Sequence, residues 1–163
     1  MSLKSTVYIE TTIPSYLTAR PSRDLIVAGR QELTRLWWET RRDKFSLCIS
    51  DFVIEEATRG HPEAARKRLE VLAEVPLLEI DNEVVGLTKT ILESGLIPNK
   101  AATDAGHVAV ASRHGVDYMI TWNCTHLANA EILRYINYVV SEAGYFLPTI
   151  CTPDELFGGE IDV

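Results

Sequence analysis

The residues in this chain best suited to chemistry are acids placed at the ends of predicted strands and on the helices between them. Glu10 ends the first β-rich run, and Asn123 comes just past the fourth. Asp104 lies in the first turns of the helix that leads into the fourth strand, and Glu55 and Glu56 lie on the helix after the second strand. Polar groups from four elements can therefore converge at one edge of a parallel sheet.

Acids gathered in this way favour a divalent cation. Carboxylates that pack together repel one another and take up protons, and a divalent cation removes that cost. Hard oxygen ligands suit Mg²⁺ or Mn²⁺, and Mg²⁺ usually keeps several waters and is completed by substrate phosphates. Such an ion lowers the pKa of a bound water and stabilises charge on a phosphate in the transition state. The chemistry that these acids indicate is cleavage of phosphodiester bonds.

Each acid also has a purely structural interpretation, and the residues alone leave both open. Glu10 could be a solvated loop residue, and Asp104 could simply favour the positive end of its helix dipole. Glu55 and Glu56 are adjacent and point in different directions, so we expect at least one of them at the surface. His107 follows Asp104 by one turn, and we interpret it as a buried histidine that bonds the backbone or an acid, with Asp104 as the acid it would orient.

The elements that must position these residues alternate between strand and helix. Short runs that are apolar on both faces predict buried parallel strands. The fold class is therefore α/β, with a mostly parallel central sheet flanked by helices. The predicted strands are 6–10, 45–49, 75–80, 118–121 and 148–151, and the predicted helices are 24–42, 51–59, 62–73, 82–94, 100–114, 130–140 and a final turn at 153–156. Asp24 is a predicted N-cap, and Gly60, Gly95 and Gly115 are predicted to follow helix ends.

Length and composition place the chain among globular proteins. Its 163 residues fit a single domain, 1–163, and 46% of them are apolar. No apolar run approaches the roughly 20 residues of a membrane span, and residues 1–6 carry no signal-peptide pattern, so we expect a cytoplasmic protein. The three cysteines, Cys48, Cys124 and Cys151, are widely spaced, which argues against a disulfide framework or a zinc site.

The charge of the chain is unevenly distributed. The net charge is −7, but residues 20–68 hold 11 of the 16 Lys and Arg residues against 8 acids. A basic segment beside an acidic remainder is typical of a metal-dependent nuclease, but solvated helix faces explain the same pattern, and on charge alone we prefer that simpler explanation. Arg20 and Arg23 are the basic residues we would assign to an RNA backbone.

Four motifs in a fixed order resemble those of PIN domains. Residues 7–13 read VYIETTI, an acid followed by Thr11 at the end of a first strand, and Ser50 is followed six residues later by Glu56. Residues 104–111 read DAGHVAVA, an Asp that opens a helix of small residues, and residues 115–123 read GVDYMITWN, a strand that runs into a Thr and a polar residue. The tail TPDEL at 152–156 is also similar to that family.

The resemblance implies a PIN fold, endoribonuclease activity that depends on Mg²⁺ or Mn²⁺, and frequent homodimers. VapC-like toxins of type II toxin–antitoxin systems, and their unpaired relatives, are the most similar branch, which implies RNA as substrate and an antitoxin protein as a partner. The implied metal ligands are Glu10, Glu56 and Asp104. Asn123 would contact the metal or its water, and Thr121 would form a hydrogen bond near the site; Thr11 and His107 would support it.

Two departures from the family pattern favour an alternative function. The family usually has Asp where Glu10 stands and often has Asp where Asn123 stands, so a second metal should bind more weakly. The alternative is a catalytically weak or inactive PIN-like module that binds RNA or a protein. Trp37 and Trp38 are neighbours on one predicted helix and should not both face inward, so the exposed one is our interface candidate.

Overall fold

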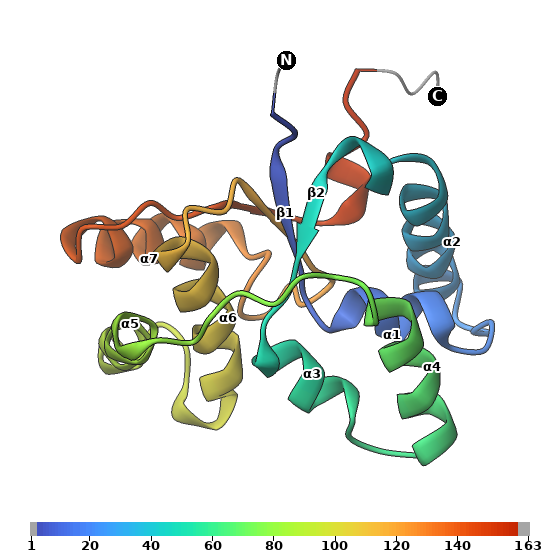
Figure 1. Ribbon diagram of the computed structural model, residues 1–163, viewed down its shortest axis with the longest axis horizontal. Coiled ribbons are helices and arrows are strands. Elements are labelled where there is room, and N and C mark those ends of the chain that lie inside the picture. Colours follow the sequence, from blue (N-terminus) through green and yellow to red (C-terminus); the bar gives the residue numbers. More distant parts are fainter. Residues whose placement is uncertain (1–2, 160–163) are drawn as a thin grey trace.

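The four strands of the sheet are all parallel, in the spatial order β2-β1-β3-β4. The computed structural model describes residues 3–159 (Figure 1). The strands are β1 (Thr6–Ile9), β2 (Ser46–Cys48), β3 (Tyr118–Ile120) and β4 (Thr149–Cys151). β1 is central, with Tyr8 opposite Cys48 on one side and Met119 on the other. The α/β class and the parallel sheet predicted from the sequence are confirmed.

Seven α-helices cover the sheet within the described residues. They are α1 (Thr12–Thr18), α2 (Leu25–Thr40), α3 (Asp51–Ala57), α4 (Pro62–Leu72), α5 (Asn82–Glu93), α6 (Ala102–Arg113) and α7 (Ala130–Glu142). Short 3₁₀ turns are η1 (Arg42–Lys44), η2 (Asn99–Ala101) and η3 (Pro153–Glu155). In Figure 1, α5, α6 and α7 lie on one side of the strands and α1, α2 and α4 on the other. β1 and β2 run into α1 and α3, so the carboxyl ends of both strands meet at these helices.

Local signals account for most helix boundaries. The Asp24 side chain accepts a hydrogen bond from Val27 N at 2.9 Å and so caps α2 as predicted. Gly95 and Gly115 follow α5 and α6 with φ of 77° and 66°, a left-handed conformation in which a side chain would be strained. α1 was missed from the sequence because it spans only seven residues and contains Pro14, which breaks any clear apolar period.

The predicted strand 75–80 is wrong. This segment makes one isolated parallel bridge, between Ile49 and Leu77, and does not extend the sheet. Pro76 has no N–H to donate to a strand ladder, and Leu77 is largely exposed. The carbonyl of Pro76 accepts from Ile49 N, and Leu78 N donates to the carbonyl of Ile49. The segment therefore covers the edge of β2 with only two hydrogen bonds.

Trp37 and Trp38 are both buried, so neither is the exposed interface residue that we predicted. Trp37 donates its Nε1–H to the carbonyl of Leu156 at 3.1 Å and stacks on Phe45. Trp38 lies beneath the guanidinium of Arg42, which is 5.1 Å from its ring centroid. Adjacent residues on a helix can both be buried here because different parts of the chain cover the two directions in which they point.

The helix that carries Asp104 is unusually buried. Every residue from 105 to 112 in α6 is buried, and α3 and α5 both pack against this helix. Gly106 provides the close approach, because a Cβ at this position would lie 2.9 Å from the ring of Phe52 on α3. Cys48 and Cys151 are buried, and burial raises the pKa of each thiol to about 12. None of the helices in the described part of the chain is long and apolar enough to cross a membrane.

Candidate metal centre

Glu10 is a buried carboxylate at the carboxyl end of β1, with 3% of its surface exposed. Its Oε1 accepts hydrogen bonds from Thr12 Oγ1 at 2.5 Å, Thr121 Oγ1 at 2.6 Å and Thr12 N at 3.1 Å. Burial nevertheless raises the pKa of Glu10, because the loss of solvation outweighs these bonds. The ionised form of Glu10 therefore needs a nearby positive charge.

Glu56 reaches the same place from α3, and Glu55 does not. Glu56 Oε1 accepts from Thr11 Oγ1 at 2.7 Å and lies 2.6 Å from His107 Nε2. Glu55 is exposed and pairs with Arg59 one turn on. Burial alone would raise the pKa of Glu56, but the hydrogen bond and the charge of His107 outweigh it and lower that pKa. The structure thus turns Glu56 toward Glu10 and turns Glu55 to solvent.

His107 contacts Glu56 and not Asp104. Our interpretation that it orients Asp104 is therefore wrong. Its ring is fully buried, with Nε2 on Glu56 and Nδ1 at 2.7 Å from the hydroxyl of Tyr8. Burial raises the pKa of Tyr8 well above its usual value, so the phenol keeps its proton and remains a neutral hydrogen-bonding partner of Nδ1. Ser50 Oγ lies 2.7 Å from the same hydroxyl. The chain from Ser50 through Tyr8 and His107 therefore holds Glu56 in one orientation.

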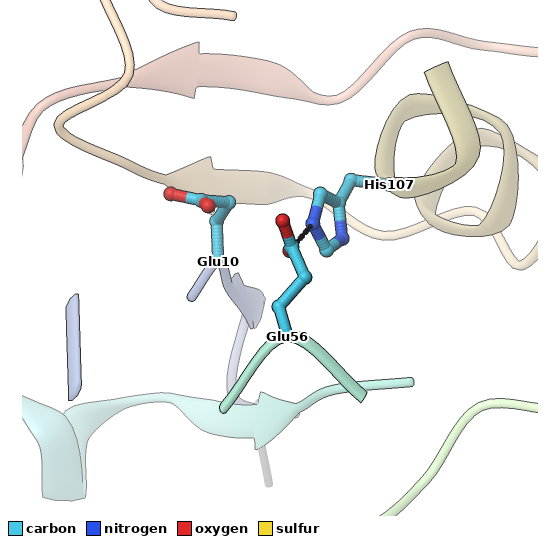
Figure 2. A group of neighbouring side chains, drawn as sticks. All are labelled: Glu10, Glu56 and His107. Carbon is cyan, nitrogen blue, oxygen red and sulfur yellow. Dashed lines mark hydrogen bonds and ion pairs between the residues drawn. The ribbon is translucent and has the colours of Figure 1, made fainter. Parts of the chain in front are cut away.

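These three groups form a compact set of ligand atoms. Glu10, Glu56 and His107 each offer one atom, and the three atoms lie within 4.8 Å of one another. Figure 2 shows Glu56 and His107 facing each other with Glu10 beside them; the three side chains come from α3, from α6 and from the end of β1. They come from three parts of the sequence, so only the sheet and its crossover helices bring them together.

Asp104 forms a second group with Asn123 and with His126, a residue that sequence analysis missed. Asp104 Oδ2 accepts from Asn123 Nδ2 at 3.0 Å and lies 2.9 Å from His126 Nδ1. Asn123 Oδ1 accepts from the backbone N–H of His126 at 3.0 Å, and Asn123 N donates to Thr121 Oγ1 at 2.9 Å. Because the same threonine hydroxyl donates to Glu10, one hydrogen-bond chain joins the two groups.

The three carboxylates share one pattern. In each, one oxygen is held by two or three donors: Oε1 of Glu10, Oε1 of Glu56 and Oδ2 of Asp104. The other oxygen of each has no hydrogen bond to any residue in 3–159. Fixed carboxylates with a free oxygen are the donors that Mg²⁺ and Mn²⁺ prefer, so the residues present fit a divalent ion.

Three basic residues lie on α2 and in the segment that precedes it. Arg20 and Arg23 are exposed in the segment between α1 and α2, and no carboxylate within the described residues pairs with either. Arg30 was not among the basic residues predicted to bind RNA, and its guanidinium lies 5.2 Å from the centroid of the Trp122 ring. The backbone N–H of Trp122 donates to Thr12 Oγ1, which in turn donates to Glu10. Arg30 is therefore held on a ring whose backbone is anchored at the acidic site.

Comparison with known proteins supports the fold. Neither a protein-family model nor a curated protein sequence matches the chain. Among solved structures it is similar to VapC20 of Mycobacterium tuberculosis, described as a toxin that cleaves the sarcin-ricin loop, with a TM-score of 0.50 and 16% identity. The match covers 85% of this chain and 95% of that one. The parallel sheet, its order of elements and this similarity together show that the chain has a VapC-like PIN fold.

Proposed function

We propose that this protein is a single-domain endoribonuclease that depends on Mg²⁺ or Mn²⁺, with Glu10, Glu56 and Asp104 as metal ligands. The observation that carries the proposal is that each of these carboxylates has one oxygen fixed by neighbours and one oxygen free. The fold likeness to VapC20, a toxin that cleaves an RNA loop, supports RNA as the substrate. Fold alone does not fix activity, so the residues of the site must supply the evidence for it.

The donors around the carboxylates preorganise the site. Thr11, Thr12 and Thr121 donate hydroxyl bonds that hold the two glutamates at fixed positions. When bound, a divalent ion supplies Lewis-acid stabilisation of the phosphodiester and lowers the pKa of a coordinated water. A bound cation would favour the ionised form of Glu10, which burial disfavours in the metal-free protein by raising its pKa. These residues therefore orient the site before the substrate arrives, so that little reorganisation is needed during the reaction.

The substrate backbone needs positive charge that the acidic site does not supply. Arg20, Arg23 and Arg30 have no carboxylate partner within residues 3–159, whereas Arg35 is paired with Glu32 and Glu39 on its own helix. Arg30 is also preorganised by its stacking on Trp122. We assign these three arginines to RNA phosphates, with a salt-dependent contribution to binding.

Partners and location follow from the fold likeness as proposals. VapC20 is described as a toxin, so this chain would be the toxin of a toxin–antitoxin pair or an unpaired relative, acting on RNA in the cytoplasm. A homodimer is the proposed assembly. Light scattering on the purified protein measures the assembly directly, and co-purification with the product of a neighbouring gene tests for an antitoxin.

The deciding experiment is cleavage of a mixed single-stranded RNA pool with Mg²⁺ or Mn²⁺. Wild type, Asp104→Asn and the exposed control Glu55→Gln are purified in the same way. We expect wild type and Glu55→Gln to cleave and Asp104→Asn to lose activity. Equal cleavage by all three would show that the activity comes from a contaminant or from another site.

A non-catalytic RNA-binding module is the second candidate. The observation that favours it is Asn123, which presents an amide N–H to Asp104 where a carboxylate would add a metal ligand. RNA binding by wild type and Asp104→Asn alike, with cleavage by neither, would support this candidate.

A further inference from the structure

The amide of Asn123 is oriented by two contacts of opposite polarity. Its Oδ1 accepts from the backbone N–H of His126, and its Nδ2 donates to Asp104 Oδ2. If the amide were flipped, an N–H would face an N–H and an oxygen would face a carboxylate, so only the observed orientation satisfies both contacts. Asn123 therefore presents hydrogen to the site and keeps its oxygen for the backbone.

His126 makes the second contact to the same carboxylate oxygen. Its Nδ1 lies 2.9 Å from Asp104 Oδ2, and since an ionised carboxylate only accepts, Nδ1 carries the hydrogen. His126 lies in the turn after Asn123, whose backbone carbonyl accepts from Leu127 N and Ala128 N. This turn fixes both donors against Asp104. Two N–H groups thus converge on one oxygen of the carboxylate.

We propose that Asn123 and His126 take the place of a second cation beside Asp104, so that the site holds one divalent ion and not two. The inference rests on the proposed function, because it concerns the metal site of that enzyme. Phosphodiester-cleaving sites with two metals hold the ions about 3.5–4 Å apart and need carboxylates to neutralise both. A second ion would need Oδ2 of Asp104 as a ligand. In this chain that oxygen already faces the N–H groups of Asn123 and His126, whose hydrogens carry partial positive charge.

The spacing of the ligand atoms around Glu10 also supports a single ion. One carboxylate oxygen of Glu10 and one of Glu56 lie within 4.8 Å of each other, which suits a single ion with several waters. Of the two oxygens of Asp104, only Oδ1 is free to bind an ion, since Oδ2 contacts two donors. A second ion would have to break both of these hydrogen bonds. The geometry therefore makes Asn123 and His126 positioning residues for Asp104.

The test counts Mn²⁺ ions in three folded proteins, by calorimetric titration and by electron paramagnetic resonance of free Mn²⁺. Wild type is expected to bind one ion. Asn123→Asp, which replaces an N–H donor with a carboxylate, is expected to bind two. The matched control is Asn129→Asp, which adds the same charge at the N-cap of α7, where Asp caps equally well, and it is expected to bind one.

A second variant keeps the proposal testable if Asn123→Asp does not fold. His126→Ala removes one donor from Asp104 and adds no charge, and it is expected to gain a second site at least tenfold weaker than the first. Two ions in wild type, or one ion in both Asn123→Asp and His126→Ala, would overturn the inference and leave the proposed function standing. No Mn²⁺ bound by wild type at millimolar concentration would overturn both.

Discussion

Glu10→Gln should make the metal-free protein more stable while abolishing metal binding. Glu10 is 3% exposed and its pKa is raised by burial, so its ionised form is unfavourable in the folded protein without a cation. A glutamine keeps the same size, and its Oε1 can accept the bonds that Thr12 and Thr121 now donate. The substitution therefore removes the charge and keeps the local hydrogen bonds.

The substitution should change the stability of the metal-free protein and the stabilisation by Mn²⁺ in opposite directions. Because the folded-state pKa of Glu10 lies above its unfolded value, stability from this group is present at low pH and is lost as pH rises through the folded pKa. Glu10→Gln should therefore be more stable than metal-free wild type at neutral pH, and each kcal/mol gained would raise the melting temperature of a domain of this size by about 2–4 °C. Mn²⁺ at a hundredfold excess over Kd should stabilise wild type by about 2.7 kcal/mol, and the variant hardly at all.

The assay is thermal unfolding at neutral pH with EDTA and with Mn²⁺. The expected result is a reversal of rank, with Glu10→Gln more stable than wild type in EDTA and less stable in Mn²⁺. Glu55→Gln, a neighbour of Glu56 on the exposed face of α3, is the control and should follow wild type in both conditions. An unchanged response of Glu10→Gln to Mn²⁺ would refute Glu10 as a ligand, and a lower melting temperature in EDTA would refute the argument from burial.

Three further predictions test other parts of the site. Tyr8→Phe leaves the buried Nδ1 of His107 without its hydrogen-bond partner and should cost about 1–3 kcal/mol in urea unfolding, whereas Tyr135→Phe, at an exposed position, should cost nothing measurable. Mn²⁺ affinity of wild type should weaken as pH falls, because Glu10, with its raised pKa, takes up a proton that competes with the ion; a calorimetric Kd that stays constant between neutral and mildly acidic pH would contradict this. Arg30→Ala should weaken RNA binding and reduce the slope of log K against log salt by about 0.7, while Arg30→Lys keeps the slope; filter binding measures both, and an unchanged slope for the alanine variant would exclude a phosphate contact.

Much of the fold could be predicted because its signals are local. Capping by Asp24, glycines after α5 and α6, and short runs that are apolar on both faces depend on neighbouring residues, and these predictions agree with the structure. The strand predicted at 75–80 was wrong for a reason that is also local. Pro76 has no N–H to donate to a strand partner, but we predicted a strand there from the apolar pattern of the segment.

The candidate site could be predicted only in part. The order of the motifs placed Glu10, Glu56 and Asp104 near the carboxyl ends of parallel strands, and that placement depends on topology that the alternation of elements implies. The choice between Glu55 and Glu56 was open, because it depends on which side of a seven-residue helix faces the sheet. Glu55 pairs with Arg59 in solvent, and Glu56 meets His107 across the sheet edge.

The sequence by itself determined the class of fold, the types of ligand available and the segments that carry them. Only the tertiary structure decided which histidine serves which acid: His107 meets Glu56, 51 residues away, and His126 meets Asp104, 22 residues away. It also decided that Asn123 offers a hydrogen to Asp104, since the backbone N–H of His126 takes its oxygen. The physical reason is that caps and periodicity act within a few residues, whereas the partner of a buried polar atom is set by the packing of the whole chain.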